Sequence, residues 1–376
     1  MIDANRKHSS SGLFSNGFDV GRLLLEGRAF FALIAIIVVF SFLSPNYLTV
    51  SNLLTMSSHV ALFAILAVGM LLVILNGGID LSVGSTLGLA GVVAGFLMQG
   101  VTLTSLGIVL YPPVWVVVVL SLALGAFIGM INGVLVARFK VPAFVATLGV
   151  MYMVRGVALL MTSGLTYNNL GGKPELGNAG FDWLGFNNLL GVPIGVVVMV
   201  VIALAAGLAL NRTAFGRWLY ASGGNERAAE LSGVPVKMVQ VSVYMLSGIC
   251  AAAAGLILSS QLTSAGPTAG TTYELTAIAA VVIGGAALTG GRGTVRGTLL
   301  GAFVIGFLSD GLVIIGISSY WQTVFTGAVI VLAVLLNSVQ YRRRVKAPSS
   351  TDGPSAPPPR EGGVRTVPSV EQKAAS

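Results

Sequence analysis

The sequence contains no Asp, Glu, Lys or Arg between residues 29 and 79. Charged residues make up only 9% of the whole chain, whereas soluble domains carry about 25%. A helix that crosses a membrane needs about 20 mainly apolar residues, because lipid offers no partners to backbone polar groups. The apolar runs are too long and too continuous for the alternating strands of an outer-membrane barrel. We therefore predict an all-α, polytopic membrane protein.

These apolar runs predict about ten transmembrane helices. They cover residues 29–43, 59–75, 83–98, 114–137, 143–161, 192–210, 239–258, 274–289, 297–315 and 321–337. The chain then divides into an N-terminal cytoplasmic segment (1–28), a transmembrane domain (29–341) and a C-terminal cytoplasmic tail (342–376). The tail is rich in Pro, Ser and Gly and is expected to be disordered.

Basic residues gather on one side of the predicted spans. Arg138 and Lys140 lie in one inner loop and Arg292 and Arg296 in another, whereas the outer loops carry only Lys173. An excess of Lys and Arg marks the cytoplasmic side of a membrane protein. We therefore expect a multi-pass protein with both termini in the cytoplasm. The net charge of +8 follows from this pattern and does not indicate a nucleic-acid partner.

The segment from Asn76 to Ser82 interrupts the apolar pattern with one carboxylate among glycines. A carboxylate at the centre of a membrane helix costs roughly 2.5–3.5 kcal/mol, so such residues usually serve a function. The glycines allow the backbone to bend and to approach a ligand. The pattern predicts a broken helix beside a polar path. Its candidate path residues are Asn76, Gly77, Gly78, Asp80 and Ser82.

A similar glycine-rich pattern recurs near the end of the transmembrane domain. Residues 282–285 read Val-Ile-Gly-Gly and residues 73–78 read Val-Ile-Leu-Asn-Gly-Gly, and each run leads into an apolar helix. Paired glycine-interrupted helices in an internal repeat point to a transport path. Two interpretations stay open: a true repeat, or glycine-rich helix ends that coincide.

The inner loop of residues 211–241 is the most charged part of the transmembrane domain. Within it, Asn225 is a candidate N-cap of a short helix, which Gly233 and Pro235 end. The small apolar surface of this helix suits a groove on a partner. We interpret it as a docking helix, and the alternative is a solvated connector. The candidate coupling residues are Gly224, Asn225, Glu226, Ala229, Ser232 and Gly233.

Two charged residues fall inside other predicted spans. Arg155 needs acceptors or water, so it either lines the cavity or fixes helix packing by bonding to carbonyls. Asp310 either faces the path or pairs with Arg155 or with another helix. Glu274 and His59, each at the start of a predicted span, are interpreted as interfacial residues.

The sequence has no G-x-x-x-x-G-K-[ST] phosphate loop, no nucleophile elbow and no paired catalytic acids. Its two His residues, its single Cys250 and its scattered acids form no metal-ligand pattern. We therefore expect no catalytic residue, metal or cofactor on this chain. Two alternatives remain: an ion-coupled secondary transporter with Asp80, Arg155, Glu274 or Asp310 as a relay, and a membrane enzyme acting on lipid.

Three motifs, in this order, resemble the ribose-type sugar permeases. They are Asn-Gly-Gly-Ile-Asp-Leu-Ser-Val-Gly-Ser from residue 76, Asn-Glu-x-Ala-Ala-x-x-Ser-Gly-Val from residue 225 and Gly-Gly-x-Gly-x-x-x-Gly-Thr from residue 290. The resemblance covers residues 29–340. These permeases are membrane subunits of bacterial ABC importers. The resemblance therefore implies the type II importer fold, the inner membrane, and two copies or two related chains around one pathway.

The resemblance also implies partners and a mechanism. A periplasmic sugar-binding protein would deliver the solute, a monosaccharide or related polyol. A cytoplasmic ATPase dimer, which binds ATP and Mg, would drive alternating access through the coupling residues named above. Asp80 would either meet the sugar or hold the broken helix by capping backbone amides. The structural role is favoured, because a transport path needs weak sites.

Overall fold

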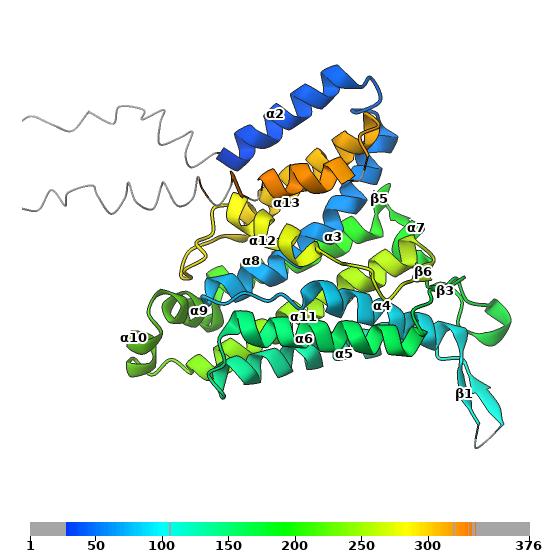
Figure 1. Ribbon diagram of the computed structural model, residues 1–376, viewed down its shortest axis with the longest axis horizontal. Coiled ribbons are helices and arrows are strands. Elements are labelled where there is room, and N and C mark those ends of the chain that lie inside the picture. The colour runs from blue at the N-terminus through cyan, green and yellow to red at the C-terminus, as the bar shows by residue number, and fades with distance from the viewer. Residues whose placement is uncertain (1–27, 105–106, 319, 330, 333–334, 336–376) are drawn as a thin grey trace, which may run out of the picture. The chain divides into compact units, whose positions relative to one another are not determined.

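The structure is a computed structural model that describes residues 28–104, 107–318, 320–329, 331–332 and 335 (Figure 1). The predicted N-terminal segment, apart from Arg28, and the predicted tail lie outside these residues, as does part of the last predicted span. Within the described residues, six helices are long and apolar enough to cross a membrane. They are α3 (Val50–Leu75), α5 (Val114–Ala137), α6 (Ala143–Thr162), α8 (Ile194–Arg212), α11 (Val236–Gln261) and α13 (Val295–Ile314).

Shorter helices complete the transmembrane body and its surface. Three of them are apolar: α2 (Arg28–Leu43), α4 (Val83–Gln99) and α12 (Tyr273–Ile283). Residues 320–329 are also helical. The surface helices are α7 (Trp183–Phe186), α9 (Ala214–Gly224), α10 (Glu226–Leu231) and the 3-10 turn η1 (Pro174–Leu176). The prediction of an all-α, polytopic fold is confirmed.

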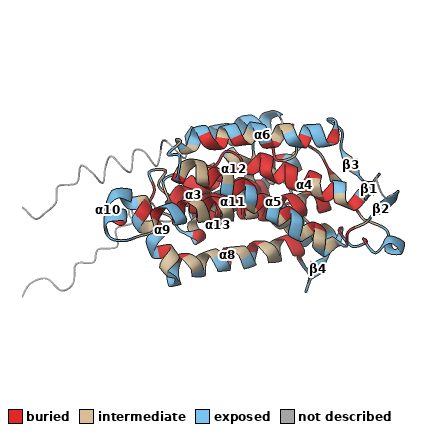
Figure 2. Ribbon diagram, turned by 90° about the horizontal axis from the view of Figure 1, so that it is seen from below, coloured by how far each residue is buried: buried red, intermediate tan, exposed pale blue. Residues whose placement is uncertain are grey.

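Three short antiparallel strand pairs connect the helices. They are β1 (Val101–Leu103) with β2 (Ile108–Leu110), β3 (Tyr167–Asn168) with β6 (Ser264–Ala265), and β4 (Asn188–Leu189) with β5 (Val192–Pro193). In both views α9 and α10 lie at one end of the helical body, and the β1–β2 hairpin lies at the other (Figures 1 and 2). We refer to these as the α10 end and the hairpin end.

The core of the body is formed by α3, α4 and α11, whose residues are mostly buried (Figure 2). The outer helices α5, α6 and α8 expose apolar side chains such as Phe127, Leu160 and Leu204. Such faces suit contact with lipid, because charged side chains are costly in hydrocarbon. The described helices therefore include a buried centre and outer helices with exposed apolar faces.

Glycines allow the central helices to approach closely. A Cβ added to Gly125 of α5 would collide with the carbonyl oxygen of Gly248 on α11, and a Cβ added to Gly248 would collide with the carbonyl oxygen of Gly125. A Cβ added to Gly255 of α11 would collide with the carbonyl oxygen of Leu87 on α4. Small residues bring helix backbones together in the same way at many membrane helix interfaces.

Two predicted span boundaries were wrong. The helix α3 begins at Val50, nine residues before the predicted start at His59. The predicted span 274–289 ends early, because α12 stops at Ile283. The first error arose because the hydroxyl residues before His59 resemble a loop. In the second, the prediction ran through the glycines at 284 and 285, where the helix ends.

Candidate functional site

The break between α3 and α4 begins with a left-handed glycine. Gly77 has a φ of 82°. The amide of Gly78 donates to the carbonyl of Val73 at 3.0 Å, and that of Gly77 donates to Ile74 at 2.9 Å. These two hydrogen bonds form a Schellman cap. Glycine is used there because an L side chain is strained at positive φ. The predicted broken helix is therefore present.

Asp80 lies in this break and is only 1% exposed. Its Oδ1 accepts hydrogen bonds from the amide of Ser82 at 3.0 Å and from the Ser82 hydroxyl at 2.6 Å. Its Oδ2 accepts from Ser247 of α11 at 3.0 Å. Asn132 of α5 donates to the Ser82 hydroxyl at 2.8 Å and lies 3.4 Å from Asp80. The carboxylate therefore connects the break to two other helices.

The partners of Asp80 were not foreseen from the sequence. Asn132 and Ser247 lie 52 and 167 residues from it in the chain. One signal was available, because Asn132 is a polar residue in an otherwise apolar run, as Met130–Ile131–Asn132–Gly133 shows. Tyr244 adds a buried neighbour, since its hydroxyl occupies the position of a Cβ on Gly78.

The break between α12 and α13 begins with the same cap. Gly285 has a φ of 92°, the amide of Ala286 donates to Val281 at 3.2 Å, and that of Gly285 donates to Val282 at 3.0 Å. The spacing of donors and acceptors equals that at Gly77. The following helix then begins at Val295, with the Thr294 hydroxyl accepting from the amide of Gly297 at 3.1 Å.

The two breaks and the end of α9 meet at the α10 end. The amide of Gly291 donates to the carbonyl of Leu75 at 2.9 Å. That carbonyl also occupies the position of a Cβ on Gly223 of α9. The hydroxyl of Ser222 donates to the side-chain oxygen of Asn76 at 3.1 Å. We call this contact of residues 75–77, 222–224 and 289–293 the glycine junction.

Tyr220 adds a further tie from α9 to the glycine junction. Its hydroxyl donates to the carbonyl of Gly293 at 2.8 Å. Burial raises the pKa of Tyr220, so the hydroxyl stays protonated and can donate this hydrogen bond. The sequence did not predict α9, whose residues were interpreted as part of a charged loop.

The short helix after α9 has the predicted cap. The side chain of Asn225 accepts from the amide of Ala228 at 3.0 Å, and Gly233, with a φ of 83°, follows the helix end. Glu226 pairs with Lys140 at 2.9 Å, and both side chains are more than half exposed. Exposed ion pairs contribute only about 0–1 kcal/mol to folding stability. A partner that binds α10 can therefore replace this pair at little cost.

Arg155 and Asp310 do not contact each other. Arg155 donates to the carbonyls of Pro267 at 2.6 Å and Ala269 at 2.8 Å. These bonds hold Arg155 to the loop before α12, which agrees with the carbonyl-bonding role considered for it; its place on the path stays a prediction. Glu274 lies near Arg155 along α4. A Cβ added to Gly84 would meet the Glu274 carboxylate, and one added to Gly88, a turn later, would meet the Arg155 guanidinium.

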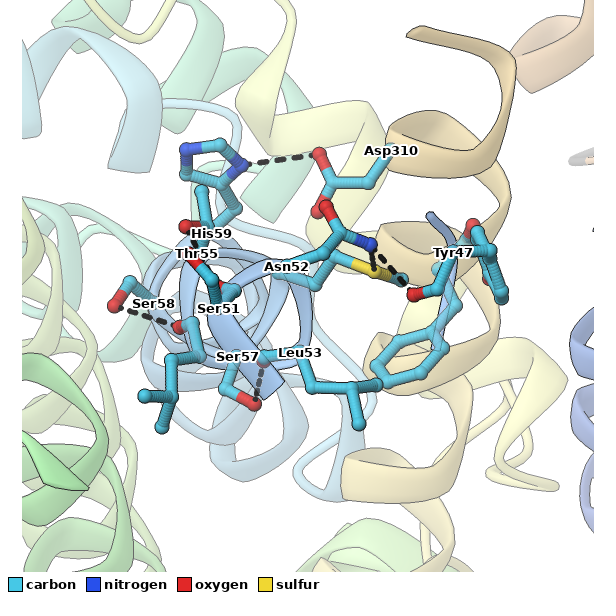
Figure 3. Close-up of polar contacts among 12 residues, drawn as sticks. Tyr47, Ser51, Asn52, Leu53, Thr55, Ser57, Ser58, His59 and Asp310 are labelled. Atoms are coloured by element: carbon cyan, nitrogen blue, oxygen red, sulfur yellow. Dashed lines mark hydrogen bonds and ion pairs between the residues drawn. The ribbon is translucent and has the colours of Figure 1, made fainter. Parts of the chain in front are cut away.

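Asp310 of α13 instead contacts His59 of α3, at 3.0 Å between Oδ1 and Nδ1 (Figure 3). This is the pairing with another helix. The predicted span start at His59 was wrong, because His59 lies nine residues inside α3. Its interfacial position stays a prediction. Burial, and then the nearby Asp310, raises the pKa of Tyr47 to about 12. Among the described residues, no group of three or more His, Cys, Asp or Glu side chains is arranged to hold a metal.

Most of the chain is similar to a known family of transport permeases. Residues 51–334 match the family described as "Branched-chain amino acid transport system / permease component". The chain is 46% identical over 315 residues to the ribose import permease protein RbsC of Escherichia coli, covering 84% of this chain and 94% of that protein. The corresponding protein of Bacillus subtilis is 44% identical over 309 residues, covering 82% and 91%.

A xylose relative is more distant. The xylose transport system permease protein XylH of Escherichia coli is 34% identical over 367 residues, covering 83% of this chain and 91% of that protein. No solved structure matches the chain. The chain therefore belongs to the branched-chain amino acid transport system permease family and, within it, to the ribose-type permeases of ABC importers.

Proposed function

We propose that this chain is the membrane-spanning permease subunit of an ABC importer and that it passes a monosaccharide or related polyol. The observation that carries the proposal is the glycine junction. It joins both helix breaks to α9, and α9 leads directly into the exposed, capped helix α10. Relatives named for ribose and xylose import support a sugar as the solute.

The mechanism is alternating access driven by a separate ATPase. An ATPase dimer binds ATP and Mg and closes against α10, which moves α9 and with it the two breaks. A periplasmic binding protein delivers the sugar, and two copies of the permease, or two related chains, enclose the path. The α10 end then faces the cytoplasm of a bacterial inner membrane. The chain itself contributes moving parts and no catalytic residue.

Transport assays test the energy source. We expect uptake of radiolabelled D-ribose or D-xylose, with the ATPase and binding protein present, to stop on ATP depletion. Uptake that survives ATP depletion but is abolished by an uncoupler would instead indicate an ion-coupled transporter. Product formed from lipid by the isolated chain would indicate a membrane enzyme.

A charge swap tests the docking role of α10. Glu226→Lys should abolish ATP-driven uptake and leave insertion and thermal stability nearly unchanged, because the pair with Lys140 is exposed. The matched control combines Glu226→Lys with Lys140→Glu, which restores an ion pair inside the chain. We expect no rescue by this double variant. Rescue would assign Glu226 to the intramolecular pair and overturn its docking role.

The orientation has its own test. Leu231 of α10 is 76% exposed, and the native Cys250 is buried. Leu231→Cys should react with a membrane-impermeant thiol reagent in inside-out vesicles and stay unlabelled in intact spheroplasts. Labelling in spheroplasts alone would reverse the proposed orientation.

A further inference from the structure

A row of polar side chains runs along the first half of α3, at the hairpin end of the body. Ser51, Thr55 and His59 are each four residues apart and all three are exposed. Residues four apart are neighbours on one helix face. Figure 3 draws these three side chains around the axis of α3, with Asp310 approaching from α13.

The next member of the row is aromatic. Phe63 follows His59 by four residues, is partly buried, and meets the ring of Tyr273 edge-on with centroids 5.0 Å apart. The row thus passes from hydroxyl groups to an imidazole and then to an aromatic pair. We call Ser51, Thr55, His59 and Phe63 the α3 row.

The row leads from the hairpin end of α3 toward the interior of the membrane. Ser51, Thr55 and His59 precede Leu75, the last residue of α3, by 24, 20 and 16 residues, which is about 36, 30 and 24 Å along the helix. Because the hydrocarbon core of a bilayer is about 30 Å thick, Thr55 lies at its edge and His59 inside it when Leu75 is at the opposite surface. Ionisable groups at such depth face a bundle interior or a water-filled cavity.

The lipid-facing helices offer a contrast. The large exposed side chains within α8, before its polar C-terminal end, are apolar: Val200, Val201, Leu204 and Leu208 are each 44–62% exposed. On α3 at the hairpin end, Ser51, Thr55 and His59 are exposed and polar, and the first residue, Val50, is the exposed apolar exception. A polar face in a membrane body indicates contact with water and solute.

The pair of His59 and Asp310 has a defined geometry. A carboxylate accepts hydrogen bonds, so Nδ1 of His59 donates to Asp310 across 3.0 Å, and Nε2 accepts a hydrogen bond in the neutral ring or donates one in the protonated ring. The side chain of His59 is 50% exposed. Asp310 therefore fixes the ring and leaves one nitrogen directed away from the protein contact.

We propose that the α3 row, with Asp310 as a positioning residue for His59, forms the sugar-contacting wall of the path at the hairpin end. This proposal rests on the proposed function. A sugar presents hydroxyls at its rim and C–H groups on its ring faces, which match the polar and aromatic parts of the row. Exchangeable single hydrogen bonds also suit a path, because a site on it must release as well as bind.

Thiol labelling tests water access without assuming any solute. Thr55→Cys in the assembled transporter should react with a charged, membrane-impermeant methanethiosulfonate added outside. The matched control is Leu204→Cys on the exposed apolar face of α8, and the wild-type chain with its buried Cys250 supplies the background. Apolar surroundings raise the pKa of a thiol, and one unit lowers the reactive thiolate about tenfold, so Thr55→Cys should react at least about tenfold faster.

Two results of the labelling would overturn the proposal. One is a rate at Thr55→Cys no faster than at Leu204→Cys. The other is a disulfide between two copies at Thr55→Cys without labelling, which would assign the row to an interface between copies. Fast labelling together with no uptake of D-ribose or D-xylose by the wild-type transporter would support the water path and reject the proposed solute.

Uptake kinetics then test contact with the sugar. His59→Leu should lower the maximal rate of D-ribose uptake about tenfold, the loss expected from one hydrogen bond. Thr55→Val keeps the side-chain shape at an exposed site and should give a smaller loss of the same kind. ATPase activity stimulated by the loaded binding protein should persist in both. The control is Ser57→Ala: its hydroxyl bonds to a carbonyl of its own helix, as that of Thr55 does, but Ser57 is half-buried and lies outside the row. Wild-type rates in both row variants would overturn the proposal.

Discussion

The break between α3 and α4 and the break between α12 and α13 start with the same Schellman cap, at Gly77 and Gly285. They differ in how the next helix begins. At the first break, Asp80 accepts bonds from Ser82 and from Ser247 of α11. At the second, the Thr294 side chain accepts from the first turn of the helix that it begins, at Gly297.

The difference separates two ways of holding a bent helix in a membrane. The first break depends on a carboxyl group that is buried and contacted by side chains from two other helices. The second depends on backbone approach, because the position of a Cβ on Gly284 is occupied by the carbonyl of Gly297. We therefore expect the first break to be sensitive to loss of a side chain and the second to gain of one.

The largest effect is expected at Asp80. Asp80→Ala leaves the donors of Ser82 and Ser247 buried without an acceptor, which costs about 3 kcal/mol or more. The thermal unfolding midpoint in detergent measures this loss. Asp80→Asn keeps the shape and should retain expression yet impair uptake. The exposed acid Asp182 supplies the control, and wild-type uptake in Asp80→Asn would remove Asp80 from any essential role.

A smaller effect is expected at the second break. Gly284→Ala forces a methyl group against the carbonyl of Gly297 and should destabilise by about 1–3 kcal/mol. Gly207→Ala in α8 is the control, because a Cβ there meets nothing within 4 Å. Equal unfolding midpoints for the two variants would show that α12 and α13 adjust freely.

The smallest of the three effects is expected at Gly77. A Cβ there comes no closer than 3.7 Å to a heavy atom, the carbonyl of Thr289. The cost of Gly77→Ala is then that of a left-handed L residue, about 1–2 kcal/mol, without an added clash. A loss larger than that of Asp80→Ala would contradict the contrast between the breaks. The same unfolding midpoints measure it.

The fold class and the first break were predictable from local patterns. Long uncharged runs predicted the helices, and the glycines before Asp80 predicted the bend. The start of α3 was missed because Thr55, Ser57 and Ser58 resemble a loop. In the structure their hydroxyls bond to carbonyls four residues earlier, which lets polar residues continue a helix.

Contacts between distant segments could not be predicted. His59 and Asp310 are 251 residues apart, and the sequence offered Arg155 as an equally good partner. Arg155 instead bonds to backbone carbonyls, which carry no sequence signal. The glycine junction was also hidden, because backbone contacts between Leu75, Gly223 and Gly291 depend on how α3, α9 and the segment between α12 and α13 pack together.

The glycine junction has a mechanical consequence. Where Gly223, Leu75 and Gly291 meet, backbone touches backbone and no side chain lies between them. Side chains can absorb a displacement by changing rotamer, but a peptide plane has no such freedom. The contact is therefore stiff, and a push on α9 reaches α3 and the segment before α13 together. The two helix breaks are then expected to move together when α9 moves.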